Sequence, residues 1–187
     1  GGHILGRLAA KGDAEVSVVA RGDTLAALRA KGIRVETPRG EVAGRVRATD
    51  DPATLGKQDA VVVAVKAPAL PSVALGLPAL IGPETSVAFV MNGIPWWYLH
   101  AHGGALEGKR LAHLDPGDAL LNTVGIERAI GGVIYGGCDA VAPGVVRVEA
   151  PQTRLILGYP DDRKSPSIDA LAAALGADDF IVEASAN

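Results

Sequence analysis

Arg21, Lys66 and Asn92 are polar residues that each follow an apolar run, and their types suit the binding of an anion. The runs are EVSVVA (15–20), AVVVAV (60–65) and SVAFVM (86–91). If these runs are strands of one parallel sheet, the side chains lie beyond the carboxyl ends of the strands, where such sheets bind ligands. Two cations and an amide there predict a site for an anionic ligand. Each residue also has a plainer explanation, as a surface cation for Arg21 and Lys66 and as a turn residue for Asn92.

Gly1 and Gly2 indicate what that anion is. In dinucleotide-binding folds a G-x-G-x-x-G motif joins the first strand to the first helix, whose N-terminus holds the pyrophosphate. With Gly1 as the last glycine of that motif, an acidic residue that binds a ribose 2′-hydroxyl is expected about 20 positions later. Arg21 stands there instead, and a guanidinium suits a 2′-phosphate. The pattern favours NADP(H) over NAD(H), and we expect the first strand and the first glycines of the fold to be missing from this sequence.

Helical and strand patterns predict the elements that position these residues. A first helix is expected to carry Ile4, Leu5, Leu8 and Ala9 and to end at residues 11–13. A second is expected to carry Leu25 and Leu28 and to be capped by Asp23 or Thr24. Two more helices are expected at 71–80 and 167–175, and a short helical turn at 50–52. Expected strands span 15–20, 60–65, 86–91, 153–157 and 180–183, with a hairpin within 33–48. The runs IGGVIYGG, near 130, and VVRVEA (145–150) flank turn residues 142–144 and are expected to pair. Because residues 60–65 do not alternate, that strand is expected to be buried on both faces.

This order of elements predicts an α/β fold of the Rossmann type, a doubly wound and mostly parallel sheet with helices on both faces. We expect residues 1–187 to form one NADP(H)-binding domain.

The composition limits the partners of the chain. It has 187 residues, a formal net charge of −3 and one cysteine, Cys138. The charge provides no general attraction to nucleic acid or to an anionic membrane, and no apolar stretch approaches the roughly 18 residues that span a bilayer. A single cysteine forms no internal disulfide, which fits a reducing, cytoplasmic compartment. Cys138 itself is expected to be a packed small side chain.

Other candidate residues carry weaker chemistry. His100 and His102 have no third ligand near them in the sequence, so we expect no metal site. His113 and Asp115 suggest acid–base work but have no neighbouring nucleophile. The aromatic run of residues 95–98 either walls the ligand site or joins the core.

Several segments together resemble the ketopantoate reductase family, whose members reduce 2-dehydropantoate to pantoate with NADPH in pantothenate biosynthesis. They are GGHILGRLAAKG, VVARGDTLAALRAKGI, DAVVVAVKAPAL, FVMNGI and IGGVIYGGCDAVAPGVVR, and they are spread over most of the chain.

The resemblance implies roles for the residues already singled out. Arg21 is similar to the family's arginine for the 2′-phosphate of NADPH, and Lys66 to its lysine on the cofactor side of the site. Asn92 resembles the asparagine that holds the nicotinamide end beside the substrate, a catalytic positioning role. Further cofactor-binding residues by the same resemblance are Gly1, Gly2 and Gly93.

The sequence departs from the family in two places. Family members continue into an all-helical C-terminal domain that carries the general-acid lysine, and this sequence does not contain it. We therefore expect the acid beyond residue 187 and expect the chain alone to be inactive. Residues 94–98 are bulkier than the family's usual sequence after the asparagine, which leaves the identity of the 2-oxo acid open.

Two alternatives to 2-dehydropantoate reduction remain. One is a related NADPH-dependent reductase of another 2-oxo acid, and the other is a non-catalytic NADP(H)-binding protein. The expected partner is a small-molecule substrate, and a homodimer is left open.

Overall fold

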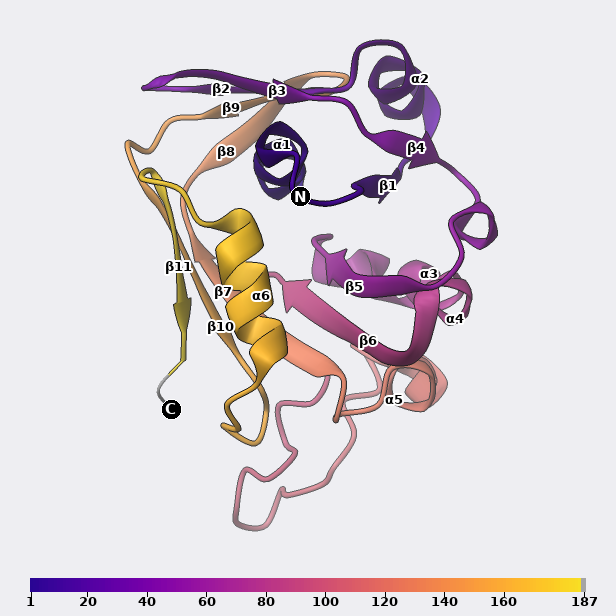
Figure 1. Ribbon diagram of the computed structural model, residues 1–187. Helices are drawn as coiled ribbons and strands as arrows, with labels where there is room; N and C mark the ends of the chain where they lie inside the picture. Colours follow the sequence, from indigo (N-terminus) through magenta and orange to yellow (C-terminus); the bar gives the residue numbers. More distant parts are fainter. Residues whose placement is uncertain (186–187) are drawn as a thin grey trace. The chain divides into compact units, whose positions relative to one another are not determined.

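The computed structural model describes residues 1–185, which fall into two compact units (Figure 1). The first unit contains residues 1–54, 135–155 and 170–183. The second contains residues 55–134 and 156–169, with 184–185. None of the helices in this described part of the chain is long and apolar enough to cross a membrane.

The first unit combines a small parallel pair of strands with a four-stranded mixed sheet. Its N-terminal elements are α1 (Gly2–Lys11), β1 (Ser17–Val19), α2 (Gly22–Lys31), β2 (Ile33–Thr37), β3 (Gly40–Gly44), β4 (Arg47–Thr49) and the 3-10 turn η1 (Pro52–Thr54). The later strands are β8 (Cys138–Ala142) and β9 (Val145–Val148). β1 pairs in parallel with β4, and the sheet has the order β3-β2-β9-β8. β2 and β3 form the predicted hairpin, and β2 also pairs in parallel with β9.

α1 packs closely on the four-stranded sheet because glycines lie at the contact (Figure 1). A Cβ atom on Gly2 would lie 2.4 Å from Cγ2 of Val146, and one on Gly6 would lie 2.2 Å from Cγ2 of Val35. Both distances are shorter than any side chain tolerates, so the helix can approach the sheet only where these residues lack a side chain. Val35 is fully buried beneath the helix.

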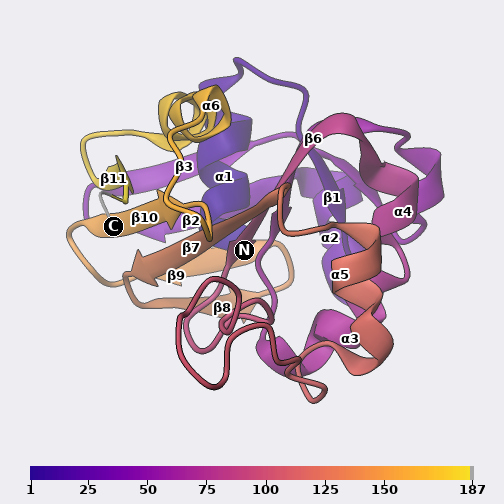
Figure 2. The ribbon, with the colours of Figure 1, turned by 90° about the horizontal axis from the view of Figure 1, so that it is seen from below.

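The second unit is built on parallel strands with short helices. Its elements are β5 (Gln58–Val63), η2 (Ala67–Ala69), α3 (Leu70–Ala74), α4 (Leu77–Leu80), β6 (Ile81–Val90), η3 (Pro116–Asp118), α5 (Ala119–Thr123) and most of β7 (Ala129–Tyr135). β6 pairs in parallel with β5 and with β7. α3, α4 and α5 lie together on one side of this unit (Figure 2). The side chains of these helices and of the strands form one apolar core. Its most buried members include Leu70, Leu120, Val124, Val87 and Phe89.

A five-stranded sheet has the order β11-β10-β7-β6-β5. Its remaining strands are β10 (Thr153–Gly158) and β11 (Phe180–Ala184), and α6 (Pro166–Leu175) connects them. The chain passes from one unit to the other between η1 and β5 and within β7, β10, α6 and β11. Strands in parallel register with helices between them confirm the predicted Rossmann-like α/β class.

The prediction that the strand at residues 60–65 is buried on both faces is wrong. β5 is an edge strand that pairs only with β6 among the described strands, and Ala60 is exposed. An edge strand has a neighbour on one side only, so its residues keep contact with solvent.

The helix predicted at 71–80 is divided into α3 and α4. A continuous helix would need the backbone of Pro78 to donate a hydrogen bond to residue 74, which proline cannot do. The helices break between these residues, and Leu75 is left 83% exposed at the junction.

The expected pairing of IGGVIYGG with VVRVEA is also wrong. β9 forms its hairpin with β8, whose residues are all exposed, while β7 pairs in parallel with β6. Turn residues 142–144 therefore join β9 to the strand directly before the turn, and that strand shows no apolar alternation by which to recognise it.

Candidate functional site

Arg21 lies between β1 and α2, with its side chain available to a ligand. Its backbone is extended (φ −134°, ψ 161°), and it is the N-cap residue of α2. The predicted caps, Asp23 and Thr24, are therefore wrong, since both lie inside the helix. The Arg21 guanidinium is exposed and has no hydrogen bond or ion pair with residues 1–185. It stands at the positive end of a helix dipole, a place that favours an anion.

Lys66 comes three residues after the end of β5. β5 ends at Val63, and Lys66 is the N-cap residue of η2. Its carbonyl accepts a hydrogen bond from the N–H of Ala69 at 2.9 Å, which fixes the backbone at this turn. The ammonium group is exposed and makes no side-chain bond within the described part of the chain.

The side-chain amide of Asn92 makes the pair of hydrogen bonds that a backbone residue of a strand would make. Its Nδ2 donates to the carbonyl of Ile134 at 3.0 Å, and its Oδ1 accepts from the N–H of Ile134 at 3.1 Å. These bonds continue the β6–β7 ladder one step past Met91, whose N–H donates to the carbonyl of Gly132. One N–H and one lone pair of the exposed amide remain for a ligand. Gly93 follows with φ +119°, a conformation that other residues rarely adopt.

The sheet register brings Lys66 and Asn92 to the same edge of the second unit. Val63 of β5 pairs with Phe89 of β6 in parallel, and each predicted residue lies three positions beyond its paired residue. Both therefore emerge at the carboxyl ends of neighbouring strands. Arg21 belongs to the first unit, and its convergence with them stays a prediction.

The N-terminal end of α1 suits a diphosphate. Gly1 is its N-cap residue, no side chain caps the helix, and no acidic residue stands in its first turn. The first helical hydrogen bond runs from Leu5 to the Gly1 carbonyl, so the N–H groups of residues 2–4 have no helical acceptor. Uncapped N–H groups with no neighbouring carboxylate are what a dinucleotide's phosphates require.

The aromatic run divides between core and surface. Trp96 is buried, and its ring centroid lies 6.0 Å from that of Phe89 and 5.0 Å from that of Trp97. Ile94 and Tyr98 are 59% and 50% exposed. Trp96 therefore joins the core, and the residues available to wall a ligand site are Ile94 and Tyr98.

The structure shows where the remaining candidate residues, such as Asp115 and Cys138, lie and what they contact. The Asp115 carboxylate accepts hydrogen bonds from the N–H groups of Leu120 and Leu121 at 2.7 and 3.0 Å, so it caps α5. Residues 1–185 contain no group of three or more potential metal-binding side chains. The expectation that Cys138 is packed is wrong, because it is exposed on the edge strand β8.

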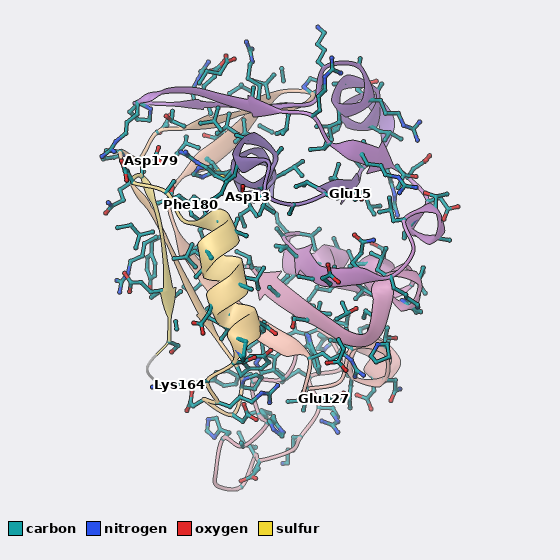
Figure 3. The ribbon with its side chains drawn as sticks, in the orientation of Figure 1. Asp13, Glu15, Glu127, Lys164, Asp179 and Phe180 are labelled. Carbon is teal, nitrogen blue, oxygen red and sulfur yellow. The ribbon has the colours of Figure 1, made fainter. Side chains whose placement is uncertain are left out.

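The sequence patterns did not predict one buried cluster of polar side chains in the first unit. Arg7 donates from Nη2 to Oδ2 of Asp179 at 2.5 Å and from Nε to Nε2 of His3 at 3.2 Å. The only sequence signal was the spacing of His3 and Arg7, which places them on one face of a helix. No local pattern pointed to Asp179, which lies in the turn directly before β11 (Figure 3).

These features define a Rossmann-like α/β protein with polar residues at its strand ends. The chain belongs to the ketopantoate reductase PanE/ApbA family, whose model matches residues 1–162. It is similar to a 2-dehydropantoate 2-reductase of Mesorhizobium japonicum, with 40% identity over 92% of this chain and 52% of that protein.

Solved structures agree. A protein of Ralstonia solanacearum MolK2 that is assigned as a ketopantoate reductase shares 42% identity, with a TM-score of 0.89 over 98% of this chain and 56% of that one. A 2-dehydropantoate 2-reductase of Porphyromonas gingivalis W83 has the same fold, with a TM-score of 0.76 at 24% identity. The chain thus spans about half the length of the relatives it matches.

Proposed function

We propose that this chain is the cofactor-binding part of an NADPH-dependent reductase that converts 2-dehydropantoate to pantoate in the cytoplasm. Family membership supports the reaction class, and the chemistry of the described residues supports the cofactor. The observation that carries the cofactor proposal is Arg21, an exposed and unpaired guanidinium at a helix N-terminus after β1.

The described residues divide the work of holding the cofactor. The uncapped first turn of α1, with Gly1 and Gly2, would bind the diphosphate through backbone N–H groups. Arg21 would bind the 2′-phosphate, and NAD(H) lacks that phosphate. Lys66 and the unused N–H and lone pair of the Asn92 amide would lie at the nicotinamide end of the cofactor. Gly93, which has no side chain, would let the cofactor approach the backbone closely.

The bound cofactor supplies a hydride to the ketone carbon of the substrate. The protein's part is orientation, and Asn92 contributes because its amide is held rigidly by Ile134. The resemblance assigns the proton for the developing alkoxide to a lysine of the family's helical domain. We therefore expect residues 1–187 alone to show no reductase activity.

The test is an assay of the product of the complete reading frame. NADPH oxidation is followed at 340 nm with 2-dehydropantoate and with a panel of other 2-oxo acids. We expect turnover with 2-dehydropantoate and a marked preference for NADPH over NADH. Cofactor binding without turnover on any 2-oxo acid would instead support a non-catalytic NADP(H)-binding protein.

A second candidate is reduction of a different 2-oxo acid with a bulky apolar substituent. Ile94 and Tyr98 favour it, because large and exposed apolar side chains follow Asn92 at a distance of two and six residues. The same panel decides between the two substrates through their kcat/KM values.

A further inference from the structure

The group formed by His3, Arg7 and Asp179 is buried more deeply than a surface ion pair. The side chains of Arg7 and Asp179 are 11% and 12% exposed, and His3 is 3% exposed. The rings of His3 and Phe180 pack in a T-shaped arrangement, with centroids 4.8 Å apart and planes at 81°. A buried ion pair seldom stabilises a fold more than apolar residues of the same size would. Its geometry therefore matters more than its contribution to the free energy of unfolding.

Each end of this group is fixed. Asp179 lies in a tight turn in which Ala177 and Phe180 exchange backbone hydrogen bonds of 2.9 and 3.0 Å. The Asp179 carbonyl also accepts from the N–H of Thr153 on β10 at 2.8 Å. The backbone of Asp179 is thus held in place by bonds that do not involve its carboxylate or Arg7.

The other end lies in the first turn of α1. Because the Nε of Arg7 donates to Nε2 of His3, that ring nitrogen carries no proton and the imidazole is neutral. His3 is one of the residues whose backbone N–H has no helical acceptor. A change in the orientation of Arg7 would therefore displace His3 and, with it, the backbone N–H groups of the first turn that would bind a diphosphate.

We propose that Asp179, Arg7 and His3 are positioning residues that hold the first turn of α1 in the orientation in which its N–H groups bind the cofactor's diphosphate. The inference rests on the proposed function. The proposal does not require any of the three side chains to touch the cofactor, because Arg7 acts through its hydrogen bonds to His3 and Asp179.

The test separates the diphosphate from the 2′-phosphate. In the product of the complete reading frame, the variant Asp179→Asn removes the charge that orients Arg7. Binding of NADPH and of adenosine 2′-monophosphate, which has no diphosphate, is then titrated. We expect the Kd for NADPH to rise about tenfold, the Kd for adenosine 2′-monophosphate to change less than about twofold, and kcat at saturating NADPH to be retained while KM rises.

The matched control is Glu183→Gln, which alters the exposed pair Arg154–Glu183 on β10 and β11 in the same way. It should leave both Kd values unchanged. Arg7→Lys keeps the charge but cannot make both hydrogen bonds in the same geometry, and it replaces Asp179→Asn if that variant does not fold.

Three outcomes would overturn the inference. Equal losses for both ligands would show that the group serves only general stability. No loss for either would show that it does not orient the helix. A wild-type protein that binds neither ligand would overturn the proposed function as well, which distinguishes that failure from the first two.

Discussion

At the scale of single residues, Arg21 decides cofactor choice in the proposed function. The variant Arg21→Ala should weaken NADPH binding by about 1.5–3 kcal/mol, the usual contribution of a hydrogen bond to a charged group, and leave NADH binding nearly unchanged. Titration of both cofactors checks this. Arg39→Ala is the matched control, because Arg39 is also exposed in the first unit and its side chain has no partner among residues 1–185. Equal losses for the two cofactors would refute the assignment of Arg21.

Asn92 has a structural role and a proposed catalytic one, and substitutions can separate them. Asn92→Asp removes the donor to the Ile134 carbonyl, and Asn92→Ala removes both bonds. Either should lower the free energy of unfolding by about 1–3 kcal/mol. Both should also lower kcat, because the residue that holds the nicotinamide end is displaced.

Chemical denaturation and saturation kinetics measure these two effects. Asn122→Asp on α5 is the control, since its exposed amide has no partner in the described part of the chain. If kcat at saturating NADPH survives in a destabilised Asn92 variant, Asn92 is a turn residue alone.

At the scale of elements, the close approach of α1 to its sheet depends on Gly6. Gly6→Ala would place a methyl group 2.2 Å from Cγ2 of the buried Val35. We expect a loss of about 1–3 kcal/mol in the free energy of unfolding, as is usual for overpacking. Gly137→Ala makes the same substitution where no atom lies within 4 Å, so it should have little effect.

A double-mutant cycle identifies the cause. If the methyl group and Val35 collide, adding Val35→Ala to Gly6→Ala should cost less than Val35→Ala costs alone in a glycine background. Additive losses would mean that the damage by Gly6→Ala arises elsewhere than at Val35.

At the scale of the whole molecule, stability should depend on His3 at acidic pH. Burial is the largest cause that lowers the pKa of His3 to about 4; the charge of Arg7 acts in the same direction, and the charge of Asp179 opposes it. In the unfolded chain this histidine has an ordinary pKa near 6.5. Between pH 6.5 and 4 the unfolded chain therefore binds a proton that the folded chain does not bind. The resulting stability is complete above pH 6.5 and is lost as the pH falls toward 4, a change on the order of 3 kcal/mol.

Urea denaturation at intervals between pH 4 and 7 measures this dependence. His3→Gln, which does not titrate, should flatten the profile, whereas His113→Gln at an exposed position should leave it as in the wild type. A profile that is unchanged in His3→Gln would assign the acid sensitivity to another group.

The amino-acid sequence by itself determined the fold class, most elements and the candidate residues at the strand ends. Those depend on short-range patterns: the apolar run before Asn92 and the helical face of Leu25 and Leu28 are visible within a few neighbours. Only the tertiary structure decided which strand pairs with which, and β8 rather than β7 forms the hairpin with β9. It also decided that Asn92 bonds to Ile134 and that Arg7 meets Asp179, 172 positions away. Contacts of that kind depend on the packing of distant segments, and no local pattern of residue types encodes them.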